Sequence, residues 1–145
     1  MEQLWAMRGN DVAKVLVAAS PEPRAVVQRM LAGHELACAT DLTQAVQLLG
    51  ERRFDLILCT IAFDDSKMFE LLRLAKSKAM WRQIPFVGAR VREQVLRSPA
   101  GIRAAAFTCR ELGAEAFLDI ADYREEPERE MREAIERILK PAEQK

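Results

Sequence analysis

The sequence predicts an α/β fold, with a five-stranded parallel sheet covered by helices on both faces. Two observations indicate it. Short apolar runs that suit strands alternate along the chain with segments whose apolar residues recur at helical spacing. The run 54–60 is apolar at nearly every position after Asp55, which is typical of a central strand buried on both faces. Alternation of this kind is the pattern of a parallel sheet between two helical layers.

Start and stop signals mark the expected elements of the first half. The first apolar run ends at 20–23, Ser-Pro-Glu-Pro, where the prolines suit a loop and a first helical turn. Apolar residues at helical spacing follow, and Gly33 stands where a helix C-terminal cap is preferred. Thr40 or Asp41 can cap the next helix, because a short side-chain oxygen accepts a hydrogen bond from a free amide of the first turn.

The second half continues the alternation. A helix is expected from Met68, and the next strand starts with Ile-Pro, which is acceptable because the first residues of a strand can forgo a ladder bond. The region 91–112 is expected to be helical, in two pieces divided by 98–101, and the last helix covers 129–140. The expected strands are 14–19, 35–39, 54–60, 84–88 and a fifth containing Phe117 and Leu118.

The sequence around the third strand resembles that of a known family. Its run Asp-Leu-Ile-Leu-Cys-Thr, followed by 68–72, Met-Phe-Glu-Leu-Leu, resembles the strand and helix around the phosphoacceptor of bacterial response-regulator receiver domains. Residues 113–118 resemble the segment that leads into the fifth strand of these domains. The resemblance covers about residues 14–140. It implies the flavodoxin-like (CheY-like) doubly wound fold, with strand order 2-1-3-4-5.

The same resemblance implies a phosphoacceptor pocket, and this chain departs from its pattern. Receiver domains hold Mg²⁺ with two acids after strand one and an aspartate after strand three, and they place a hydroxylated residue and a lysine after strands four and five. The corresponding positions here are Ala19, Ser20, Thr60, Arg90 and Ile120, with Asp119 as the alternative to Ile120. The pattern's nucleophile and metal ligands are therefore missing, and we expect no phosphorylation, no enzymatic activity, no metal and no cofactor.

Other chemistry-bearing residues suit structural roles. Asp64 and Asp65 with Glu22 form at best a weak cation site, and solvated loop residues are the simpler expectation. His34 is expected in a surface turn. The cysteines Cys38, Cys59 and Cys109 lack paired spacing and are interpreted as small core residues.

Composition bounds the class of protein. The 145 residues suit one domain, and the formal net charge is zero. We expect a leader at 1–12, a receiver-like domain at 13–140 and a tail at 141–145. The absence of a long apolar stretch or signal peptide favours a cytoplasmic location. Trp5 in the leader either frays, packs back on the domain or engages a partner.

The charge is unevenly distributed, which suggests a binding surface. Residues 73–110 contain nine Lys or Arg and one acid, and Arg92, Arg97 and Arg103 lie in the expected fourth helical region. The favoured function is a phosphorylation-independent receiver-like interaction module of a bacterial signalling pathway, binding a protein partner or itself through helix four, strand five and helix five. Membrane binding is not expected, and the lack of interleaved aromatics disfavours nucleic acid. The alternative is a small-anion or nucleotide-binding sensor domain, or a remnant enzyme, using a pocket lined by Ala19, Ser20, Thr60 and Arg90.

Overall fold

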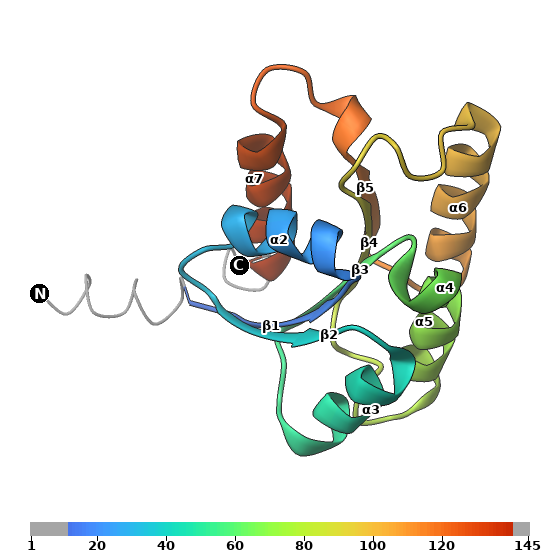
Figure 1. The fold of residues 1–145 in the computed structure, drawn as a ribbon. Coiled ribbons are helices and arrows are strands. Elements are labelled where there is room, and N and C mark those ends of the chain that lie inside the picture. Colours follow the sequence, from blue (N-terminus) through green and yellow to red (C-terminus); the bar gives the residue numbers. More distant parts are fainter. Residues whose placement is uncertain (1–11, 141–145) are drawn as a thin grey trace, which may run out of the picture.

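A computed structural model describes residues 12–140, which form a five-stranded parallel sheet (Figure 1). Its order is β2-β1-β3-β4-β5, so the predicted topology is confirmed. Every residue of β3 is buried, as the apolar run predicted for a central strand. The strands are β1 Lys14–Ala18, β2 Glu35–Ala39, β3 Leu56–Thr60, β4 Phe86–Arg90 and β5 Ala116–Asp119.

Helices cover both faces of the sheet (Figure 1). They are α2 Pro21–Met30, α3 Leu42–Glu51, the short α4 Phe63–Ser66, α5 Met68–Ser77, α6 Pro99–Glu111 and α7 Pro127–Leu139, with a 3-10 turn, η1, at Ile120–Asp122. α2 and α7 pack on one face over Leu58 and Val87, whereas α3, α5 and α6 pack on the other over Ile57 and Phe86. The core therefore has two halves, separated by the sheet. No helix of the described range is long and apolar enough to cross a membrane.

Local signals in the sequence explain the ends of the helices. Asp41 caps α3 by accepting a hydrogen bond from the amide of Gln44 at 2.8 Å. Ser98 caps α6 by accepting a hydrogen bond from the amide of Gly101. Pro99 occupies the first helical turn, where a backbone N–H would have no intrahelical partner, so its absence in proline costs nothing. Gly33, expected as the C-terminal cap of α2, lies two residues beyond the actual C-cap, Leu31, and has a φ of +101°, a conformation that glycine adopts without steric cost.

The prediction of a helical piece at the start of 91–112 is wrong, because within that region only α6, Pro99–Glu111, is helical. The segment 91–98 is a loop held by a side chain. Arg90 donates from Nε to the carbonyl of Val95 and from Nη2 to that of Glu93, both at 2.7 Å. Leu96 has a φ of +49°, which breaks any helical path. The fourth strand also begins two residues later than expected, at Phe86.

His34 lies in the turn before β2, as predicted, but the expectation that it is at the surface is wrong. Its side chain is only 3% exposed. Nδ1 accepts a hydrogen bond from the amide of Ala13 at 2.9 Å, which leaves the ring proton on Nε2, 3.2 Å from the carboxylate of Glu136. The imidazole therefore joins the segment before β1 to α7.

Candidate functional site at the carboxyl edge of the sheet

Small side chains fill the edge where β1 and β3 end. Ala19 directly follows β1 and is fully buried, and Thr60, the last residue of β3, is 2% exposed. The register pairs Ala18 with Cys59, so Ala19 and Thr60 lie level with each other. Ser20 is the N-cap residue of α2 and makes no side-chain capping bond. Ala19 and Thr60 are therefore closed to solvent, whereas Ser20 is partly exposed.

Thr60 stands out because its hydroxyl is buried without a hydrogen-bond partner in the described part of the chain. A buried hydroxyl that lacks a partner costs about 1–3 kcal/mol in desolvation. No acid or histidine accepts its proton, so nothing in the described range activates the hydroxyl as a nucleophile.

Two of the three acids expected near this edge, Glu22 and Asp64, are engaged elsewhere, and the third, Asp65, is exposed. Glu22, in the first turn of α2, pairs with Arg92 of the β4–α6 loop at 3.0 Å. Asp64 accepts a hydrogen bond from the amide of Leu42 at 2.8 Å and so helps to hold the start of α3. Among residues 12–140 no group of three or more His, Cys, Asp or Glu side chains could hold a metal ion.

Arg90 does not lie beside Thr60. Side chains alternate between the faces of a strand, and Thr60 pairs in register with Ala89 rather than Arg90. Arg90 therefore projects on the α5–α6 side, like Phe86 of the same strand, whereas Thr60 shares the α2–α7 side with Leu58. Within residues 12–140 no hydrogen bond joins Arg90 to Thr60, because Arg90 donates to Asp119, Glu93 and Val95 instead.

Arg90 instead makes a buried ion pair with Asp119, its register partner in β5. Nη1 lies 2.6 Å from Oδ1, and the two side chains are 5% and 10% exposed. The same Oδ1 accepts a hydrogen bond from the amide of Ala121 at 3.1 Å. Ile120 begins η1 and packs against the α2–α7 half of the core. The pair therefore joins the ends of β4 and β5, and it also fixes the β4–α6 loop.

Two of the three expected surface arginines are free to bind. Arg97 and Arg103 are exposed and make no ion pair within the described residues, whereas Arg92 is engaged by Glu22. Arg97 also lines an open hollow of about 530 Å³ with Arg124 and Tyr123, between the loops after β4 and β5. Exposed cations thus gather at this end of β4 and β5.

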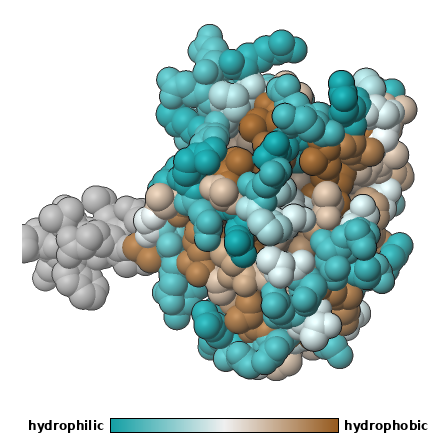
Figure 2. Space-filling view, viewed as in Figure 1, coloured by the Kyte–Doolittle hydropathy of each residue, from teal (hydrophilic) through white to brown (hydrophobic). Residues whose placement is uncertain are grey.

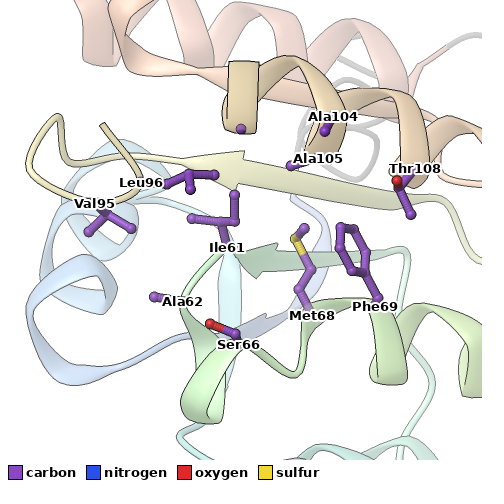
Figure 3. A pocket seen from close by; sticks show the side chains of 11 residues that line it. Ile61, Ala62, Ser66, Met68, Phe69, Val95, Leu96, Ala104, Ala105 and Thr108 are labelled. Atoms are coloured by element: carbon purple, nitrogen blue, oxygen red, sulfur yellow. The ribbon is translucent and has the colours of Figure 1, made fainter. Parts of the chain in front are cut away.

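A second hollow, missed by the sequence analysis, lies between α5 and α6; we call it the α5–α6 pocket (Figure 3). Its volume is about 400 Å³. Small residues in the first turns of α6, Gly101, Ala104 and Ala105, are the one sequence signal that could have indicated it. Its lining is Ile61, Ala62, Ser66, Met68, Phe69, Val95, Leu96, Gly101, Ala104, Ala105 and Thr108.

Comparisons with known proteins find structural likeness without sequence likeness. No protein-family model and no curated protein matches the chain. The receiver domain of a signal transduction histidine kinase from Syntrophus aciditrophicus matches 92% of this chain and 95% of its own, with a TM-score of 0.70 and 18% identity. A chemotaxis response regulator of Vibrio cholerae matches 86% of this chain and 97% of its own, with a TM-score of 0.64 and 23% identity.

A third structure is the receiver domain of a sensor histidine kinase from Pseudomonas aeruginosa, with a magnesium ion coordinated in its active-site cleft. It covers 90% of this chain and 96% of its own, with a TM-score of 0.64 and 18% identity. At identities this low, the likeness shows that the fold is shared, and it does not show that the chemistry of the site is shared. The chain has the CheY-like, flavodoxin-like architecture of response-regulator receiver domains.

Proposed function

We propose that the chain is a receiver-like signalling module that acts without phosphorylation. One observation carries the proposal: Ala19, Ser20 and Thr60 occupy the ends of β1 and β3, where the receiver pattern has three carboxylates. Mg²⁺ requires oxygen ligands, preferably charged, and an alanine supplies none. Without the metal and the aspartate, neither the nucleophile nor the counter-charge for a phosphoryl group remains.

The environment of Thr60 supports a non-enzymatic role. An alkyl hydroxyl needs a general base to become a nucleophile, and the buried Oγ1 has no partner in the described range that could take its proton. Ala19 beside it is also fully buried, so neither of these two side chains is accessible to a substrate from solvent. The receiver-like unit, residues 13–140, would then act by binding.

The binding surface we propose is formed by α6, β5 and α7 with the β4–α6 loop. The Arg90–Asp119 pair holds that loop through the carbonyls of Glu93 and Val95. In receiver domains the position of Arg90 responds to the phosphoryl group, whereas a buried ion pair there favours one fixed arrangement. Arg97 and Arg103 remain exposed for an acidic protein partner, or for a second copy, in a bacterial cytoplasmic pathway.

The alternative function is a small-anion or nucleotide sensor. The residues that favour it are Arg97 and Arg124, and not Arg90 as first expected. Arg90 already donates hydrogen bonds to Asp119, Glu93 and Val95, so few of its N–H groups are left for an anion. Arg97 and Arg124 flank an open hollow and are not ion-paired within residues 12–140. Titration calorimetry with inorganic phosphate and with ATP, each without Mg²⁺, distinguishes this function from protein binding.

Incubation with acetyl phosphate and Mg²⁺ tests the main proposal. We expect the intact mass to stay unchanged, because no carboxylate stands at the acceptor position. A receiver domain that has its aspartate, treated in parallel, should gain one phosphoryl group. A stoichiometric gain by this chain, whether acid-labile or acid-stable, would contradict the proposal.

A further inference from the structure

The α5–α6 pocket has the size and chemistry of a small-molecule site. Small-molecule pockets measure about 300–1,000 Å³ and are lined mainly by apolar side chains with a few polar groups. The volume here is about 400 Å³, and no lining residue carries a charge. Met68 and Phe69 line it from α5, and Leu96 lines it from the β4–α6 loop (Figure 3). Ser66 and Thr108 contribute its two hydroxyl groups.

The pocket is bordered by strained backbone. Within residues 12–140, all four non-glycine residues with positive φ lie beside it, in the distorted α4 turn and in the β4–α6 loop: Asp64, Asp65, Ser66 and Leu96. Such conformations cost about 1–3 kcal/mol each and persist only where the surrounding structure holds them. Asp64 is held through the amide of Leu42, and the Leu96 loop through Arg90. These bonds hold both walls in place, so the hollow is formed before any ligand arrives.

Small residues of α6 keep the pocket from filling. A side chain at position 101 would place its Cβ 3.1 Å from Cδ1 of Leu96, so glycine lets Leu96 cross over the helix. Ala104 and Ala105 follow on the same wall, where longer side chains would occupy the space. Figure 2 shows hydrophobic residues reaching the surface in patches between hydrophilic ones, so an apolar site open to solvent is compatible with the rest of this face.

We infer that the α5–α6 pocket binds a small, neutral, mainly apolar molecule. An ionised ligand would lose its hydration without meeting an opposite charge in the lining. The hydroxyls of Ser66 and Thr108 lie at opposite sides of the hollow (Figure 3). They suit a ligand with a carbonyl or hydroxyl group that can accept or donate one hydrogen bond. This inference is independent of whether the chain is phosphorylated or binds a protein.

The neutral fluorophore N-phenyl-1-naphthylamine tests the inference on the full chain. We expect saturable binding of one probe per chain, with enhanced and blue-shifted emission. Ala104→Phe, which fills the pocket, should weaken binding at least tenfold. Ala100→Phe is the matched control, because Ala100 is also exposed on α6 but does not line the pocket, and its affinity should stay within twofold of wild type.

Several outcomes would overturn the inference. The first is a lack of saturable binding. The second is an equal loss of probe affinity in Ala104→Phe and Ala100→Phe when both variants melt like wild type. The third is binding of an anionic naphthalene sulfonate as tight as that of the neutral probe. Methyl NMR shifts on probe addition should appear at Ile61, Leu96 and Thr108, and shifts confined to other methyls would place the probe elsewhere. If the chain forms a dimer that excludes the probe, and if Phe107→Ala dissociates that dimer and restores probe binding, the occupant is a second copy. Phe107 suits this test because it is 63% exposed on α6.

Discussion

Arg90 and Asp119 show how one pair of side chains sets the shape of a loop. Both are almost completely buried, and Asp119 also caps η1 by accepting a hydrogen bond from the amide of Ala121. Removing one partner of a buried ion pair leaves an uncompensated charge, whereas apolar replacement of both is often tolerated. The pair is thus a structural constraint whose loss should be felt in the stability of the whole domain.

Asp119→Ala should lower the free energy of unfolding by about 3–5 kcal/mol, because Arg90 would remain buried without its counter-charge. Urea denaturation followed by circular dichroism measures the change. The double variant Arg90→Met with Asp119→Leu is the control, and it should lie much closer to wild type. A single variant as stable as wild type would show that solvent reaches Arg90 and that the pair does not hold the loop.

The cysteines differ in burial, and we expect them to differ in reactivity for that reason. Burial raises the pKa of the Cys109 thiol to about 11 and that of Cys59 well above its ordinary value. Cys38 is only partly buried, which departs from the expectation that all three lie in the core. Because the thiolate is the reactive form, a raised pKa protects the thiol.

We therefore expect a disulfide reagent such as DTNB to modify one thiol per native chain at pH 8, and all three in denaturant. Unfolded thiols ionise first as the pH rises from about 9 toward 11, so unfolding becomes easier over that range. Mapping of the modified peptide should identify Cys38. Rapid native modification of Cys59 or Cys109 would contradict their burial.

At the scale of elements, the short α4 turn between β3 and α5 depends on Asp64. Its φ of +47° is unusual for a residue with a side chain. Its carboxylate accepts a hydrogen bond from the amide of Leu42 at the start of α3. Asp and Asn tolerate this conformation better than other residues with a Cβ. The side chain therefore offsets strain within its own turn and satisfies a free amide of another helix.

Asp64→Ala should lower the free energy of unfolding by about 1–3 kcal/mol, since the strain stays and the bond to Leu42 is lost. Asp64→Asn keeps an oxygen acceptor and should lose less than half as much. Thermal and urea unfolding of the two variants make the comparison. Equal losses would show that the charge, and not the hydrogen bond, is what matters.

Local signals made most elements predictable. Strand β2 and the cap at Asp41 were identified because their causes lie within a few residues of sequence. The loop at 91–98 was missed because Arg90, whose side chain holds it, is itself paired with a residue 29 positions away, and the burial of His34 was missed because it contacts a residue 102 positions away. The α5–α6 pocket is likewise assembled from three segments, so no single stretch of sequence reveals it.

At the scale of the whole molecule, zero net charge conceals a basic surface. Arg97 precedes α6 and Arg103 lies on it, both exposed, while Arg52 and Arg53 lie exposed after α3, at the opposite edge of the sheet. The two pairs allow the same change of charge to be made at two distant places. Electrostatic attraction of a partner depends on where charges lie, whereas solubility and nonspecific effects follow the total.

Reversal of Arg97 and Arg103 to Glu should slow association with the proposed partner, or with a second copy, and leave the melting temperature nearly unchanged, because exposed charges contribute little to folding. Wild-type association should itself slow as salt rises, since screening shortens the reach of the field. Sedimentation velocity and capture of partner from the source cell provide the measurement. Reversal of Arg52 and Arg53 changes the net charge equally and should have little effect, so equal losses in both variants would assign the attraction to overall charge and move the interface away from α6.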